Sequence, residues 1–218
     1  MAVNIGKLES FVRNHMQGDA SGHDWFHADR VRKTACGLAR SEGCQDLDVV
    51  IVAALLHDVA DRKLHPDPTA AKQEIRAILV ESGFNATQLE HVMEITEGVS
   101  YRGAGVRTPM RTLEGQVVQD ADRLDAMGAI GIARCFAYGG RKGRPMYDPS
   151  RPPVLHSDAE SYHGDDGPSL NHFFEKLLLL RDRMQTGSAK KAATQRHRFL
   201  EDFVREFLSE WDSQDLQG

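Results

Sequence analysis

The chain has 218 residues, 40% hydrophobic and 27% charged, with a net charge of −5. These values are typical of a globular protein of about one domain, and they exclude a molecule that is basic overall and binds nucleic acid through that charge. The three cysteines, Cys36, Cys44 and Cys135, form no CxxC pair, which indicates a reduced setting. The N-terminus has no signal-peptide pattern and the longest apolar stretch, residues 49–56, is too short to span a bilayer, so we expect a cytoplasmic protein.

Apolar residues recur at three- and four-residue spacing along nearly the whole chain, which predicts an all-α fold. Asp46, Thr69 and Asn85 stand where helices are expected to begin, as capping residues. Gly43 stands where the second helix is expected to end. The expected helices cover about 8–16, 25–41, 47–60, 69–81, 86–96, 112–138, 170–185 and 189–211.

The helix at 47–60 is apolar on nearly all sides, which predicts a buried central helix. Residues 139–168 are rich in Gly, Pro, Asp and Arg, and we interpret them as a long flexible loop near the site. We expect a single domain over 1–218, with a metal-site core at about 20–130 and C-terminal helices at about 169–213 packed on it.

Histidine and aspartate recur in three segments of this expected bundle. His57 and Asp58 follow the buried helix directly, His23 and His27 are spaced to share a helix face, and Asp122 borders an apolar stripe. The pair His57–Asp58 alone is more typical of a helix end with a solvated carboxylate than of a metal site. Taken together, imidazoles and carboxylates suit Mn²⁺, Fe²⁺, Zn²⁺ or Ni²⁺ and tolerate Mg²⁺.

The segments HDWFHADRV, AALLHDVADRK and QDADRLDAMGAIGIAR carry these residues. In order and spacing they resemble the HD superfamily of metal-dependent phosphohydrolases. The closing segments NHFFEKLLLL and RHRFLEDFVREFLSEW are similar to a bacterial branch of small stand-alone HD-domain nucleotide pyrophosphohydrolases. The resemblance implies an HD-domain helical bundle in which His27, His57, Asp58 and Asp122 bind one divalent ion. Mn²⁺ is favoured, with Mg²⁺, Ni²⁺, Co²⁺, Fe²⁺ and Zn²⁺ as alternatives.

Further residues near these ligands are candidates for the reaction itself. Related HD nucleotidases carry an acidic residue at the position of Asp61, which we interpret as an acid/base or water-positioning group. Lys63 is interpreted as a catalytic and substrate-binding point charge for a phosphate. His23 is either a phosphate contact or a helix cap, and Asp24 either a cap or a carboxylate behind a ligand. Loop cations are candidates for a polyphosphate, although each alone is more typical of a solvated surface: Arg102, Arg107, Arg141, Lys142 and Arg144.

The resemblance favours hydrolysis of nucleoside triphosphates to monophosphate and pyrophosphate by a metal-activated water. A 5′-nucleotidase-type or alarmone-type phosphohydrolase is the enzymatic alternative, and a catalytically silent metal- or nucleotide-binding regulator is the alternative of another class. A two-metal cyclic-dinucleotide enzyme would need additional histidine ligands, and its signature differs from this one, which counts against that class. The expected partners are a small phosphorylated substrate and a second copy of the chain, without nucleic acid or membrane.

Overall fold

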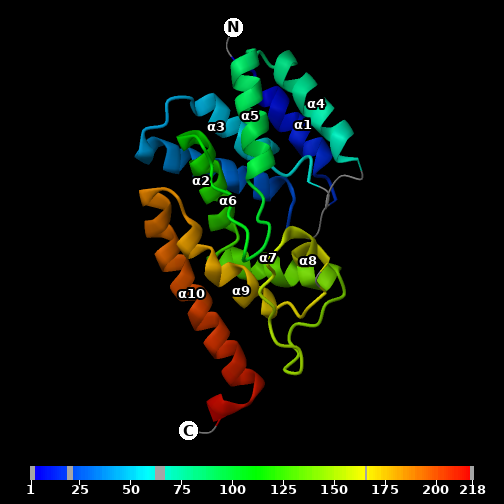
Figure 1. Cartoon of the computed structure of the whole chain (residues 1–218), viewed down its shortest axis with the longest axis vertical. Coiled ribbons are helices and arrows are strands. Elements are labelled where there is room, and N and C mark those ends of the chain that lie inside the picture. The colour runs from blue at the N-terminus through cyan, green and yellow to red at the C-terminus, as the bar shows by residue number, and fades with distance from the viewer. Residues whose placement is uncertain (1–2, 19–21, 62–66, 165, 217–218) are drawn as a thin grey trace. The chain divides into compact units, whose positions relative to one another are not determined.

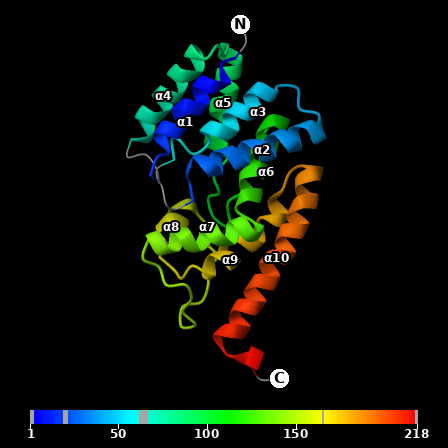
Figure 2. The ribbon, with the colours of Figure 1, turned by 180° about the vertical axis from the view of Figure 1, so that it is seen from behind.

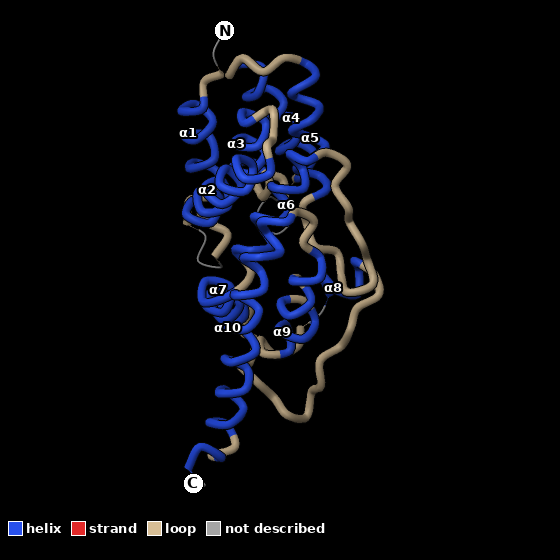
Figure 3. Tube along the Cα trace, turned by 90° about the vertical axis from the view of Figure 1, so that its left-hand side faces the viewer, coloured by secondary structure: helices blue, strands red, loops and turns tan. Residues whose placement is uncertain are grey.

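The computed structural model describes residues 3–18, 22–61, 67–164 and 166–216, and no strand occurs among them (Figure 3). The predicted all-α fold is therefore confirmed. None of the helices in these residues is both long enough and apolar enough to cross a membrane. The helices are α1 (Ile5–His15), α2 (Trp25–Glu42), α3 (Leu47–Leu56), α4 (Pro68–Glu81), α5 (Ala86–Gly98), α6 (Leu113–Asp125), α7 (Gly128–Arg141), α8 (Ala159–Gly164), α9 (Asn171–Glu175) and α10 (Gly187–Trp211), with 3₁₀ turns at Leu177–Leu179, Arg181–Arg183 and Gln214–Leu216.

The chain forms two compact units. The first unit comprises residues 1–101, 108–122 and 185–188, and the second comprises 102–107, 123–184 and 189–218. The single domain over 1–218 stays a prediction.

In the first unit, α3 is the central helix, as its sequence predicts. It packs against α1, α2 and α5, and the views from front and back agree that α2 and α3 run beside each other (Figures 1 and 2). All residues from Val52 to Leu56 are fully buried. Burying such side chains contributes about 1.5–3 kcal/mol each for the larger ones, which makes α3 a rigid base for whatever follows it.

The helix caps follow local sequence signals closely. Asp46 and Asn85 cap α3 and α5 as predicted, and Asn85 forms a capping box with Gln88. Thr69 was wrongly assigned as the cap of α4. Asp67 takes that role, accepting hydrogen bonds from the backbone N–H groups of Thr69 and Ala70, because Pro68 fits the first helical position and needs no donor partner there.

The long helix predicted over 112–138 is wrong, since the chain breaks between α6 and α7. Met127 is extended, with φ −119° and ψ 162°, and Gly128 has φ +67°, which a glycine adopts without strain. The Arg196 guanidinium donates to the carbonyl of Leu124 and so satisfies the end of α6. Gly139 and Gly140 lie within α7, which ends at Arg141 instead of at the glycine pair.

The second unit is built around α7, α9 and α10. Aromatic rings from the three helices pack together through Phe136, Phe173 and Phe203, with ring centroids 5.5–6.0 Å apart. The predicted helix at 170–185 is wrong: α9 stops at Glu175 and 3₁₀ turns follow, because Lys176 leaves the helical region with φ −142° and ψ −62°. The predicted loop at 139–168 contains the end of α7 and the short α8.

Candidate metal centre

The His57–Asp58 pair lies directly after the last turn of α3. The predicted continuation of this helix through residue 60 is wrong, because α3 ends at Leu56 and a tight turn follows. In that turn the backbone N–H of Val59 donates to Leu56 and that of Asp61 donates to Asp58, both at 3.0 Å. The turn places a histidine and an aspartate at the end of a helix that is otherwise apolar.

His57 is oriented by the backbone of α3. Its Nδ1 lies 2.8 Å from the carbonyl oxygen of Ala54, which can only accept a hydrogen bond, so Nδ1 carries a proton. In the neutral ring, Nε2 then has a free lone pair. Fixing one ring nitrogen by a carbonyl so that the other is a ligand is typical of metal-binding histidines.

The four residues predicted as ligands come together in the first unit. The Nε2 atoms of His27 and His57 are 3.1 Å apart, and Asp58 Oδ2 lies 3.2 and 3.4 Å from them. Asp122 Oδ1, from α6, lies 3.6 Å from each Nε2. Ligand atoms of His27, His57 and Asp122 all fall within 4.8 Å of one another.

These spacings fit donors around one divalent ion. With ligand bonds of about 2.1 Å, neighbouring donors stand roughly 3.0 Å apart in octahedral and roughly 3.4 Å apart in tetrahedral coordination. Asp58 Oδ2 is buried and makes no hydrogen bond within the part of the chain that the structure describes, although the Nε2 atoms of both rings lie close to it. Such a carboxylate oxygen is costly to bury unless a cation compensates it. The donor set therefore suits a divalent metal.

Burial and charge act against each other in this cluster. Burial by itself lowers the pKa of His57, but the carboxylates of Asp58 and Asp122 outweigh it and raise that pKa well above its usual value. Burial raises the pKa of both carboxyl groups, yet the charge and close approach of the His57 and His27 rings hold the pKa of Asp58 well below its usual range and that of Asp122 at about 2. The four groups favour ionised carboxylates facing positive charge.

Two buried residues before Asp122 fix α6 in the first unit, and sequence reasoning missed both as functional supports. Asp120 accepts hydrogen bonds from the backbone N–H groups of Gln185 and Thr186 and from the Thr186 hydroxyl, at 2.8–3.1 Å. Gln119 donates to the carbonyl oxygens of Gly98 and Thr108, at 2.8 and 2.9 Å. The only signal in the sequence was the polar type of these two residues. The structure shows that both are fully buried, and buried polar groups need hydrogen-bond partners.

The remaining predicted site residues have mixed outcomes. Asp24 caps α2 by accepting from the backbone N–H of His27 at 2.9 Å, and the His23 ring stands edge-on to that of His27 with centroids 5.8 Å apart. Asp61 is half-buried at the end of the turn. Arg102 is exposed and belongs to the second unit, and Lys63 lies outside the described residues.

An all-α fold with two imidazoles and two carboxylates converging at helix ends defines a class of helical proteins that bind a divalent metal. Comparison with known proteins identifies the family within that class. The profile of the HD domain matches residues 25–127. An HD-superfamily hydrolase from Bacillus thuringiensis is 44% identical, with 95% of this chain and 96% of that chain covered and a TM-score of 0.72. The chain belongs to the HD superfamily.

Two further crystal structures are similar over almost the full length. A protein from Lactobacillus plantarum is 37% identical, with 96% of this chain and 97% of that chain covered and a TM-score of 0.87. Bacillus subtilis YpgQ in complex with ADP is 35% identical, with 95% and 97% covered and a TM-score of 0.74. Family membership and the donor cluster together make this chain a metal-dependent phosphohydrolase.

Proposed function

We propose that this chain hydrolyses nucleoside triphosphates to a nucleoside monophosphate and pyrophosphate, using one divalent ion held by His27, His57, Asp58 and Asp122. The observation that carries the proposal is the convergence of the four donor atoms at 3.1–3.6 Å. The similarity to YpgQ, whose structure contains ADP, supports a nucleotide as the substrate class.

A divalent ion in this cluster would supply the activation of water and the neutralisation of phosphoryl oxygens. Mn²⁺ is the proposed metal, because a mixed set of two imidazoles and two carboxylates combines borderline and hard donors. The protein's own contribution is to hold the donors rigidly. His57 is fixed by the carbonyl of Ala54, and Asp122 by the anchored helix α6.

Asp61 is the proposed general acid/base. In the turn that follows α3, the backbone N–H of Asp61 donates to the carbonyl oxygen of Asp58 at 3.0 Å. This hydrogen bond holds the backbone of Asp61 close to that of Asp58, one of the proposed metal ligands. A half-buried carboxylate at this position can accept a proton from water or deliver one to the leaving oxygen. Lys63, two residues further on, is the proposed contact for a substrate phosphate.

Hydrolysis assays on a nucleotide panel test the proposal. The metal-free protein is supplemented in turn with Mn²⁺, Mg²⁺, Co²⁺ or Ni²⁺, and pyrophosphate and orthophosphate are measured separately. We expect pyrophosphate as the product from triphosphates, with Mn²⁺ giving the highest rate. Orthophosphate from monophosphates would instead identify a 5′-nucleotidase, and no product with any metal would identify a binding protein.

A further inference from the structure

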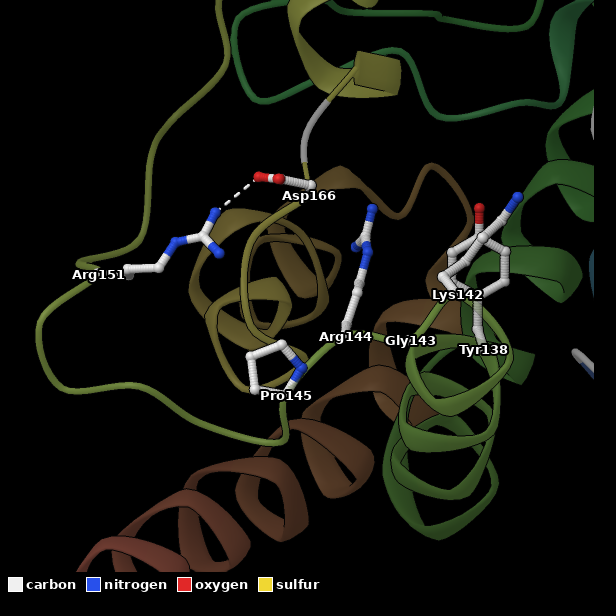
Figure 4. Close-up of a pocket in the computed structure, with 7 residues that line it drawn as sticks. All are labelled: Tyr138, Lys142, Gly143, Arg144, Pro145, Arg151 and Asp166. Carbon is white, nitrogen blue, oxygen red and sulfur yellow. Dashed lines mark hydrogen bonds and ion pairs between the residues drawn. The ribbon is translucent and has the colours of Figure 1, made fainter.

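A polar cavity of about 400 Å³ lies in the second unit, at the end of α7. Figure 4 shows the side chains of Lys142, Arg144 and Arg151 around it, together with Tyr138 and Asp166. Its volume is within the usual range of ligand pockets, about 300–1,000 Å³. Three cations and one carboxylate line it, whereas the whole chain is negative. The cavity is therefore a local concentration of positive charge on an acidic protein.

The turn at the C-terminal end of α7 positions two of the cations, Lys142 and Arg144. The backbone N–H of Arg144 returns to the carbonyl of Gly139, and Gly143 makes the return with φ +69°. This turn sets Lys142 Nζ and the Arg144 guanidinium over the Tyr138 ring, 5.8 and 5.7 Å from its centroid. Their positions follow from backbone geometry and a shared aromatic surface.

The third cation comes from a separate segment whose backbone is also anchored. The side-chain amide of Asn171, a buried residue of α9, donates to the carbonyl of Arg151 at 2.8 Å. Close by, the N–H groups of Ser169 and Leu170 donate to the carbonyls of Pro145 and Met146, both at 2.9 Å. The cavity walls are thus held together by hydrogen bonds before any ligand arrives, which lowers the entropic cost of binding.

Asp166 already occupies part of this positive surface. Its Oδ1 accepts from Arg151 Nη2 at 2.6 Å, and that hydrogen bond, followed by the charges of Arg151 and Arg144, lowers the pKa of Asp166. A helix C-terminus favours nearby cations through its dipole, which accounts for Lys142 and Arg144. It does not account for Arg151, which reaches the same cavity from outside α7.

We propose that this cavity, defined by Lys142, Arg144, Arg151 and Tyr138, binds the phosphate groups of a small polyanion. Guanidinium groups match the geometry of phosphate oxygens and can bind two at once, and a lysine adds a point charge. The shared chemistry is a phosphoanhydride, either free pyrophosphate or the phosphate chain of a nucleotide. The site is made of second-unit residues alone and does not depend on the proposed hydrolysis.

The test is calorimetric titration of inorganic pyrophosphate into the full chain at low ionic strength, with EDTA present so that the metal centre contributes no bound ion. We expect saturable binding that weakens about 5- to 20-fold in Arg144→Gln and in Arg151→Gln, since each loses a charge-assisted contact. Asp166→Asn should bind about 3- to 10-fold more tightly, because it removes the carboxylate that competes for Arg151. A gain in affinity cannot come from misfolding. Asp166→Asn therefore tests the proposed site even if an arginine variant fails to fold.

Two matched controls separate this site from others. Arg181 is an exposed arginine of the second unit, paired with Asp182 and outside the cavity, so Arg181→Gln should bind pyrophosphate like the wild type. His57→Ala should do the same, because the metal cluster is not the site. Competition by ATP but not by adenosine assigns the phosphate chain of a nucleotide, and no competition by ATP assigns free pyrophosphate. Absence of saturable binding, unchanged affinity in the cavity variants, or loss of binding in His57→Ala would overturn the proposal.

Discussion

Asp120→Ala is the change that tests most directly how the protein positions Asp122, the proposed metal ligand of α6. The Asp120 carboxylate is fully buried and accepts from two backbone N–H groups and the Thr186 hydroxyl. A hydrogen bond to a charged group contributes about 1.5–3 kcal/mol, and such bonds on one group are not additive. Alanine removes all of them and leaves buried donors without acceptors. We expect the free energy of unfolding to fall by about 3–5 kcal/mol, which lowers Tm by roughly 6–20 °C in a chain of this size.

Thermal unfolding is measured on metal-free protein, because a bound ion would add its own stabilisation. The control is Thr186→Val, which removes the hydroxyl contact and keeps both backbone donors, with an expected loss of about 1–2 kcal/mol. Mn²⁺ affinity is the second measurement, and it should fall in Asp120→Ala because Asp122 is attached two residues further along the same helix. A loss below about 1 kcal/mol, or a loss no larger than that of Thr186→Val, would refute the hydrogen-bond reasoning. Unchanged Mn²⁺ affinity would refute the positioning role.

Three further predictions concern the reaction, the metal and the second unit. Asp61→Asn should lower kcat about 10²- to 10⁴-fold in the nucleotide assay while Mn²⁺ still binds in a titration, and near-normal turnover would remove its proposed role. Mn²⁺ affinity should rise by up to tenfold per pH unit above pH 6.5, because the raised pKa of His57 keeps a proton on the metal-free cluster that the ion must displace. By the same linkage, the stabilisation from that proton is complete below about pH 6.5 and is lost in metal-free protein as the pH rises through the folded pKa. Gly139→Ala should destabilise the chain by about 1–3 kcal/mol in chemical unfolding, because the new methyl group would overlap the hydroxyl of Ser169.

The sequence predicted those features that depend on neighbouring residues. Asp46 and Asn85 cap their helices because a side-chain oxygen three residues before a backbone N–H forms the same contact in any protein. The apolar run of α3 predicted a central helix because burial on all sides requires an apolar surface on all sides. The proposed ligand positions came from the resemblance of whole segments, since the pair His57–Asp58 alone is more typical of a solvated helix end.

Features that depend on distant residues were missed for a physical reason. The break between α6 and α7 interrupts no apolar pattern, and the partner that satisfies the carbonyl of Leu124 is Arg196, 72 residues away. Likewise, Glu175 ends α9 with its carboxylate accepting from the backbone N–H of Val154, a contact across 21 residues. Neither pairing leaves a local signal, because both residues are ordinary polar members of their own segments. Helix propensity over 112–138 therefore predicted continuity where tertiary contacts favour a turn.

The pKa directions of the donor cluster bear on what the site is built to hold. In the metal-free protein, the two carboxylates are held ionised and the His57 imidazole is pushed toward its protonated form, so a proton supplies the positive charge between them. One proton neutralises one carboxylate, and it sits on a ring nitrogen instead of at the centre of the four donors. A divalent cation would match both carboxylates at once and return the His57 ring to the neutral state in which its Nε2 is a ligand. The same buried charges that are costly in the metal-free cluster would thus become the source of metal affinity, which is why the C-terminal end of the most apolar helix can carry two of the four donors.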